Sequence, residues 1–165
     1  METFDGLIFS LTFLAVLGSG LVAGVCFIFS VAIMKALGRI PPAEGMSAMQ
    51  SINIVIINPI FLGVFLGTGA ACIFLTIGSI LRWQNGGAAY LLAGAVVYLL
   101  GSIVVTVVCN VPMNDALAAA PATEPKSTEL WSNYLSNWTQ WNHVRTVASL
   151  GSTAFLTIAL ISRSE

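Results

Sequence analysis

Long apolar runs alternate with short polar segments along most of this 165-residue chain. Four runs are long enough to cross the hydrocarbon core of a bilayer, which takes about 20 apolar residues in a helix. They cover about residues 7–37, 46–81, 88–110 and 141–162. Because backbone amides in lipid must pair within their own segment, we predict four helices. The pattern indicates an all-α fold, an integral membrane four-helix bundle that forms one domain over residues 1–165.

Turn-forming residues mark the connections between the predicted spans. Pro41 lies where the first span ends, and Asn85-Gly86 predicts a tight turn between the second and third spans. Pro59 falls inside the second span and should kink it near residues 55–59, because proline lacks a backbone N–H and clashes with the preceding turn. The long connection, residues 111–140, carries aromatic residues in its second half, which we expect to lie along the membrane surface before the fourth span.

Composition supports a membrane location. The chain is 57% hydrophobic and only 8% charged, whereas soluble domains carry about 25% charged residues. The outer surface should therefore face lipid, which is the partner that the composition predicts. A net charge of −1 provides no basic patch and argues against nucleic acid as a partner.

Glycines at helical spacing predict where the helices approach closely. The pairs Gly20 and Gly24, Gly63 and Gly67, and Gly94 and Gly101 each leave one helix face without side chains. Packing within one chain is the favoured interpretation of these faces, and a homo-oligomer is the alternative.

Polar residues concentrate in residues 110–115 and 131–146, and the second stretch holds three of the four tryptophans and the only histidine. Within it, Trp138, Asn142 and Arg145 are spaced four and three residues apart, so they form one stripe on a helix. An ionised side chain at membrane depth needs a partner. Asp115, at the matching end of the third span, is the candidate partner of Arg145.

Topology brings many of these side chains to one end of the bundle. The candidate site residues are Asn53, Asn58, Asn110, Asn114, Asp115, Trp138, Trp141, Asn142, His143 and Arg145. Each has a structural alternative: tryptophans form belts at membrane surfaces, asparagines bond neighbouring helices, and a lone histidine is more often structural than catalytic. Their clustering at one end nevertheless favours a functional site.

Metal and nucleophile chemistry find little support in the sequence. One histidine and three dispersed cysteines cannot build a normal closed metal site from one chain, and no cofactor is predicted. A haem held by a single histidine, or a metal shared between subunits, stays open. The cysteines are expected to be buried, unpaired packing residues.

Several short motifs together resemble the anthrone-oxygenase-like family of small four-helix membrane proteins. They are Met49-Gln50-x-Ile52-Asn53, Asn58-Pro59-x-Phe61, Asn110-Val-Pro-Met-Asn-Asp115 and Trp138-x-x-Trp141-Asn142-His143-Val-Arg145-Thr146. Fungal members of that family oxidise polyketide anthrones to anthraquinones with dioxygen, whereas most bacterial relatives have no established activity. The resemblance implies a multi-pass protein, which we expect in a bacterial plasma membrane.

If that reaction carries over, the substrate is a small hydrophobic aromatic or quinone-like compound, oxidised through its enolate without a cofactor. Histidine changes charge near neutral pH, so His143 is the candidate base. Arg145, Asn142, Asn110 and Asn114 are candidate donors to the oxyanion, with Trp138 and Trp141 as flat walls. The alternative is a non-enzymatic membrane binding, transport or accessory protein whose polar cluster holds the helices together.

Overall fold

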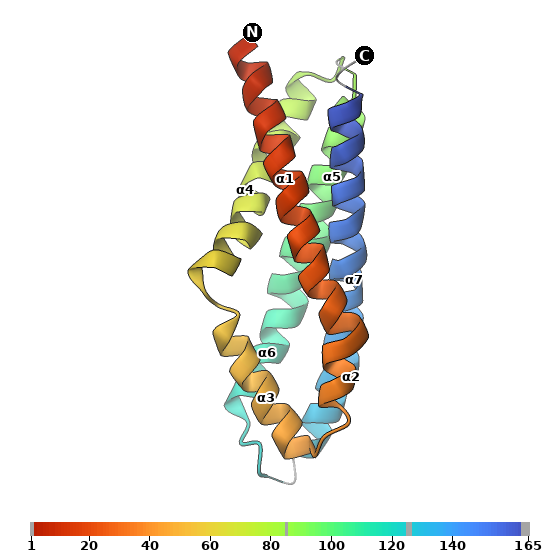
Figure 1. The fold of residues 1–165 in the computed structure, drawn as a ribbon. Helices are drawn as coiled ribbons and strands as arrows, with labels where there is room; N and C mark the ends of the chain where they lie inside the picture. The colour runs from red at the N-terminus through yellow and green to blue at the C-terminus, as the bar shows by residue number, and fades with distance from the viewer. Residues whose placement is uncertain (1, 85, 125–126, 163–165) are drawn as a thin grey trace.

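The structure is a computed structural model that describes residues 2–84, 86–124 and 127–162, with side chains from residue 5 onward. The helices of the described residues form four rods. Figure 1 shows them as one long bundle, in which the first and last described residues lie at the same end. The turn between the second and third rods lies at that end too, and Gly87 adopts a positive φ of 80° there. Asn85, part of the predicted turn, lies outside the described residues.

All four rods are helical, as predicted. The first consists of α1 (Glu2–Ile28), a π-helical turn η1 (Phe29–Ile33) and α2 (Met34–Leu37); the second of α3 (Pro42–Val55) and α4 (Pro59–Leu81). The third consists of α5 (Ala88–Tyr98), the π-helices η2 (Leu99–Val104) and η3 (Thr106–Asn110), and α6 (Val111–Ala119); the fourth is the single helix α7 (Ser127–Ile161). Each rod includes a segment long and apolar enough to span a membrane.

The four rods pack around a square in which α7 and α4 each contact both α1 and α5. Glycine allows the closest approach of the third and fourth rods, as predicted. A Cβ at Gly101 would lie 2.3 Å from Cβ of Ala148, and one at Gly94 would lie 2.8 Å from Leu156. By contrast, a Cβ at Gly24, Gly63 or Gly67 would meet nothing within 4 Å. The expectation that these three glycines pack within the chain is therefore wrong.

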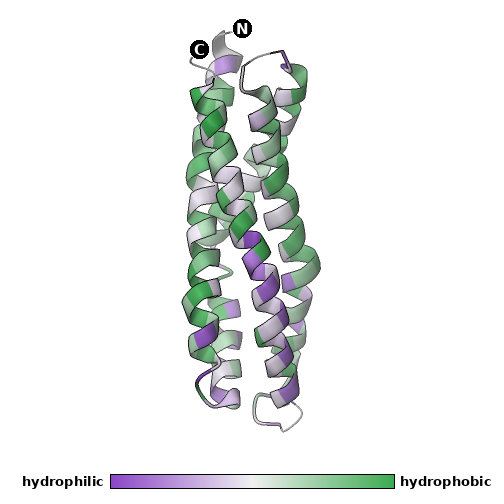
Figure 2. Ribbon diagram, turned by 90° about the vertical axis from the view of Figure 1, so that its right-hand side faces the viewer, coloured by the Kyte–Doolittle hydropathy of each residue, from purple (hydrophilic) through white to green (hydrophobic). Residues whose placement is uncertain are grey.

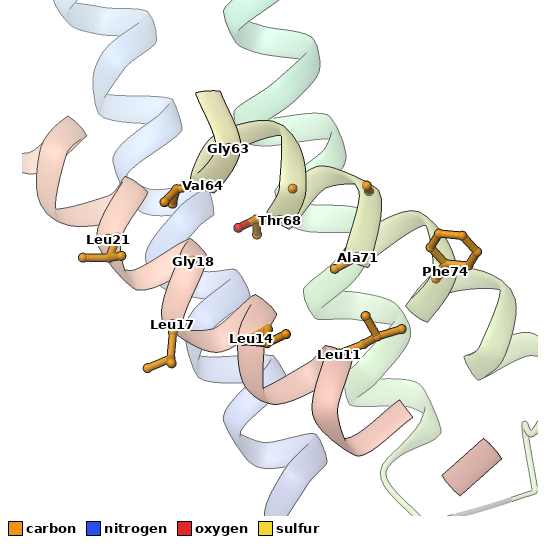
Figure 3. A pocket seen from close by; sticks show the side chains of 12 residues that line it. Leu11, Leu14, Leu17, Gly18, Leu21, Gly63, Val64, Thr68, Ala71 and Phe74 are labelled. Carbon is orange, nitrogen blue, oxygen red and sulfur yellow. The ribbon is translucent and has the colours of Figure 1, made fainter. Parts of the chain in front are cut away.

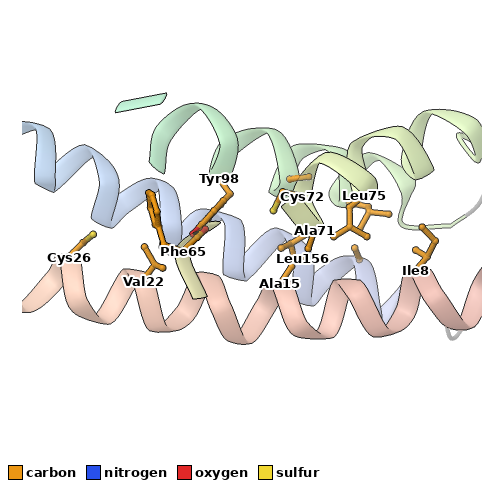
Figure 4. Close-up of a cluster of buried hydrophobic side chains, with 13 residues drawn as sticks. Ile8, Ala15, Val22, Cys26, Phe65, Ala71, Cys72, Leu75, Tyr98 and Leu156 are labelled. Atoms are coloured by element: carbon orange, nitrogen blue, oxygen red, sulfur yellow. Dashed lines mark hydrogen bonds between the residues drawn. The ribbon is translucent and has the colours of Figure 1, made fainter. Parts of the chain in front are cut away.

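Buried side chains form two clusters stacked along the bundle axis. The first, here called the membrane core, fills the half nearer the termini and includes Ile8, Ala15, Val22, Phe65, Cys72, Leu75, Tyr98 and Leu156 (Figure 4). The second, the cap core, consists of Met34, Leu37, Met46, Met49, Leu117, Trp131, Tyr134 and Trp138. The three cysteines are free, and two of them, Cys26 and Cys72, are buried.

The outward face of α7 changes character partway along the helix. Its 35 residues span about 52 Å, whereas the hydrocarbon core of a bilayer is about 30 Å thick. Exposed side chains are polar before residue 141 (Ser132, Asn133, Ser136, Asn137, Gln140) and mostly apolar after it (Val144, Val147, Leu150). Figure 2 shows most of the hydrophilic residues in the same half of the bundle. We infer that the part formed by α2, α3, α6 and residues 127–140, here called the cap, lies beyond the hydrocarbon layer.

Three local predictions need correction. Residues 127–140 do not lie along the membrane surface, because Trp131 and Tyr134 are buried in the cap core and the helix continues straight into the fourth span. The third helix does not end near residue 110, since α6 follows η3 without a break and contains Pro112 as its second residue. Near Pro59 the second helix is broken rather than kinked, and α4 starts anew at that residue.

Candidate functional site

A group of buried polar side chains crosses the bundle between the membrane core and the cap core. We call it the polar belt; its members are Asn142, Arg145, Thr146 and Ser149 of α7, Ser30, Ser102 and Asn110. Asn142 donates both amide hydrogens, to the Cys26 carbonyl at 2.7 Å and to Ser30 Oγ at 2.8 Å. The stripe predicted on the fourth helix thus faces the interior.

Each π-helical segment contributes one residue to the polar belt. Ser30 is the buried residue of η1, Ser102 of η2 and Asn110 of η3. Ser30 lies 3.3 Å from the Thr146 hydroxyl, Ser102 lies 3.1 Å from the Ser149 hydroxyl, and Asn110 Nδ2 donates to the Trp138 carbonyl at 3.3 Å. π-Helical turns in otherwise α-helical rods are frequent at functional sites. Here they direct three polar side chains of the first and third rods onto one face of α7.

Arg145 is the charged member of the polar belt, and only 8% of it is exposed. Its Nε atom has no hydrogen-bond partner. Asn110 has a second unpartnered atom, its buried Oδ1. Within the described part of the chain, the polar belt thus holds a buried donor and a buried acceptor that have no hydrogen-bond partner.

A second network lies on the cap side of the polar belt. Asn114 Oδ1 accepts hydrogen bonds from the Tyr134 hydroxyl and from Trp138 Nε1, both at 2.8 Å, and Asn53 Nδ2 donates to the Tyr134 hydroxyl at 3.4 Å. The rings of Trp131, Tyr134 and Trp138 stack in sequence, with centroids 5.7 and 5.9 Å apart. This arrangement occupies three of the predicted site residues, Asn53, Asn114 and Trp138, in holding α3, α6 and α7 together.

The structure separates four other predicted residues from the polar belt. Asn58 caps α4. Its Oδ1 accepts hydrogen bonds from the backbone N–H groups two and three residues further along the chain, at 3.1 and 3.0 Å. Asp115 is exposed, and among the described residues no ion pair joins it to Arg145, so the predicted pairing is wrong. Trp141 is 41% exposed, and His143 is exposed on the outward face of α7. The site residues therefore do not form one pocket.

Five contributors to the site were not among the predicted site residues: Ser30, Ser102, Thr146 and Ser149 of the polar belt, and Tyr134 of the network on its cap side. Ser30 bridges Asn142 and Thr146 from the first rod, and Tyr134 links Asn53 to Asn114. A signal for the serine exists in the sequence, because Ser19 and Ser30 are eleven residues apart and so share a helix face. Tyr134 resembles an ordinary core aromatic in sequence, and only the packing shows that its hydroxyl joins three rods.

A family model described as anthrone oxygenase matches residues 58–155 of the chain. The match begins at the cap of α4 and includes the polar-belt residues of the third rod and α7. No curated protein and no solved structure matches the chain. Among the described residues, no group of three His, Cys, Asp or Glu side chains lies close enough together to hold a metal ion.

Proposed function

The chain belongs to the anthrone oxygenase family, and from that premise we propose that this multi-pass membrane protein is a cofactor-independent oxygenase. Its substrate would be a small hydrophobic aromatic or quinone-like compound with an activated methylene group. The reaction converts that methylene to a carbonyl with dioxygen. The polar belt would be the place where the substrate's developing negative charge is stabilised.

The buried Nε–H of Arg145, which has no partner, is the observation that carries this proposal. Placing an arginine within a membrane helix costs about 2.5–3.5 kcal/mol on insertion scales, and an unpaired buried polar group costs a further 1–3 kcal/mol, roughly. The neighbouring Asn142 and Ser30 bond each other, whereas this charged group has no partner for its Nε–H. An enolate oxygen supplies the missing acceptor, and it also meets the positive charge of the side chain.

The chemistry needs no redox group from the protein. Loss of a methylene proton gives an enolate, whose carbon bonds to dioxygen to form a hydroperoxide. Loss of the remaining C–H proton then breaks the O–O bond, which leaves a carbonyl and releases water. The methylene carbon supplies all four electrons, so no external reductant is consumed.

The polar belt suggests a role for each neighbouring residue. Arg145 would donate to the enolate oxygen, and Asn110 Oδ1 would accept a hydrogen bond from the enol form of the same group. Asn142, whose amide hydrogens are both used within the bundle, would hold α7 against α1 rather than touch the substrate. His143 lies on the opposite side of α7 and has no part in this arrangement, so the released proton passes to water at the boundary of the cap.

A non-enzymatic binding protein is the second candidate, and the dense pairing of most of the polar belt favours it. Ser30, Ser102, Asn142, Thr146 and Ser149 are all bonded to one another or to the backbone across rods. In such a protein the same buried arginine would hold a carbonyl compound without oxidising it.

The deciding experiment follows anthrone oxidation by the protein reconstituted in lipid nanodiscs, with an oxygen electrode and the absorbance of anthraquinone. We expect Arg145→Gln to lower the rate about 100- to 1,000-fold, the usual effect of removing one oxyanion donor. Ser152→Ala is the matched control, because Ser152 Oγ is also buried without a partner on α7. An Arg145→Gln variant as fast as the wild type would refute the proposal. Tight anthraquinone binding without any oxidation would support the binding protein instead.

A further inference from the structure

We propose that the substrate reaches the polar belt from within the bilayer, through a groove between α1 and α4 that opens where the second rod is broken. The occupant is a flat, uncharged aromatic molecule. This inference rests on the proposed function for the fate of the molecule. It goes further in assigning a binding route to residues outside the polar belt.

The break in the second rod is a built feature of the fold. α3 ends at Val55 and α4 begins at Pro59, with Asn58 as the capping residue between them. The Asn58 side chain donates to the Val55 carbonyl at 3.0 Å and accepts hydrogen bonds from the N–H groups of Ile60 and Phe61. These bonds satisfy backbone groups that the break leaves free. Non-helical backbone at membrane depth persists where it lines a cavity.

A groove of about 390 Å³ lies beside this break. Its lining is apolar except for Asn58. The lining residues are Leu21, Val22, Val25, Asn58, Ile60, Phe61 and Val64. Sites for small organic molecules occupy about 300–1,000 Å³. The groove is therefore large enough for a small ring system, and it carries no charged side chain that would select an ionised ligand.

The groove continues towards the middle of the bilayer. A second hollow of about 450 Å³ between α1 and α4 shares Leu21 and Val64 with it (Figure 3). Gly63 and Gly67 line this second hollow, here called the upper hollow. A Cβ added at either glycine would have no atom within 4 Å. Figure 3 shows leucines of α1 along its other side. A hydrophobic compound dissolved in the hydrocarbon layer can therefore reach the break without crossing water.

The inner side of the groove leads to the polar belt by two short routes. Phe61 stacks on Phe65 with ring centroids 5.8 Å apart and an interplanar angle of 7°, and Phe65 contacts Tyr98 at 6.3 Å. On α1, Val25 precedes Cys26, whose carbonyl accepts the amide of Asn142. A flat ring on Phe61 would therefore lie beside the stack that leads to Tyr98, and next to the α1 segment that bonds Asn142 of the polar belt.

This geometry selects the class of occupant. The parallel rings of Phe61 and Phe65 extend into a stack of three when a further flat ring lies on them, which is a favourable offset arrangement for aromatic groups. A lipid chain would fill the upper hollow but has no flat group for Phe61. An anion would find no countercharge among the residues that line either hollow.

The test fills the groove and measures both catalysis and binding in lipid nanodiscs. Val25→Trp fills the groove beside the break. Leu21→Trp narrows the point where this groove meets the upper hollow. Val147→Trp is the matched control, because Val147 is 71% exposed on α7 and lines neither hollow. We expect both groove variants to lower kcat/KM for anthrone at least tenfold and to weaken binding of tritiated anthraquinone to a similar extent. The control should keep wild-type values.

The outcomes separate this inference from the proposed reaction. If Arg145→Gln abolishes oxidation while both groove variants keep wild-type kcat/KM and anthraquinone affinity, the route is wrong and the reaction stands. If the wild type oxidises no anthrone but the groove variants lose anthraquinone binding, the groove stands and the reaction falls. Equal losses in the groove variants and in Val147→Trp would overturn the route. Leu21 is largely exposed, so its variant tests the route even if Val25→Trp does not fold.

Discussion

Residues next to each other in sequence serve opposite faces of α7. Asn142 is almost completely buried and bonded to α1, whereas His143 projects from the other side of the helix. His143 and Arg145 are two positions apart along the helix, which turns their side chains about 160° apart at 100° per residue. A histidine beside an arginine in the printed sequence is therefore remote from it in the folded bundle.

The role of His143 can be tested directly by substitution. We expect His143→Ala to keep oxidation of anthrone within about twofold of the wild-type rate. The His143 side chain lies outside the polar belt, and its removal leaves the hydrogen bonds of the polar belt intact. The measurement is the initial rate in nanodiscs, with retention of helicity by circular dichroism as the check on folding. A loss of more than about a hundredfold would move the chemistry to the outer face of α7 and restore histidine as the base.

The sequence predicted part of the site because helical periodicity is a local property. Trp138, Asn142 and Arg145 share a stripe, and all three face the interior. The partner of Arg145 could not be predicted in the same way. Asp115 lies at the correct end of the third rod, but the π-helices that precede it change the rotation of everything that follows, and its carboxylate faces outward. Small changes in helical phase are not visible in a pattern of apolar and polar residues.

At the scale of the elements, close packing and open grooves depend on which glycine faces a neighbour. The sequence gives Gly63 and Gly101 the same helical setting among apolar residues. In the structure, Gly101 lies against Ala148 and Gly63 lines the hollow between α1 and α4. The choice depends on the direction of α4 after its break, which is set by the Asn58 cap and by packing against the other rods.

This contrast predicts different costs for the same substitution. Gly101→Ala would place its Cβ 2.3 Å from Ala148 Cβ and should destabilise the bundle by about 1–3 kcal/mol, the usual cost of overpacking. Gly63→Ala adds a methyl group to open space and should be neutral or slightly stabilising, since alanine is the better helix former. Thermal unfolding in the same detergent compares the two. Equal melting temperatures for both variants would contradict the packing of the third rod on α7.

At the scale of the whole molecule, the bundle has two stacked cores with different surroundings. The number of spans and the all-α fold follow from apolar runs, so the sequence was enough to predict them. The cap could not be predicted in the same way, because its helical segments come from distant parts of the sequence and bury one another. Met46 and Met49 of α3 pack in one cluster with Leu117 of α6 and Trp131 of α7. The aromatic half of the long connection therefore extends the bundle instead of lying along the bilayer.

The boundary between cap and membrane gives the remaining prediction. In a background with Cys109→Ala, single cysteines at exposed positions of α7 should report on the surroundings of the helix, since Cys26 and Cys72 are buried. Ser132→Cys and Asn137→Cys, in the cap, should react with a membrane-impermeant maleimide at least tenfold faster than Val147→Cys, which lies beyond Trp141 in the hydrocarbon layer.

Right-side-out and inside-out vesicles extend this labelling to the orientation of the chain. Because residues 127–140 form one continuous helix within the cap, Ser132→Cys and Asn137→Cys must be labelled in the same vesicle type and protected in the other. Full labelling after detergent solubilisation controls for reactivity of the thiols themselves. If Asn137→Cys reacted as slowly as Val147→Cys while Ser132→Cys reacted freely, the bilayer would extend past Trp141, and the polar belt would lie deep within the hydrocarbon layer instead of at its boundary with the cap.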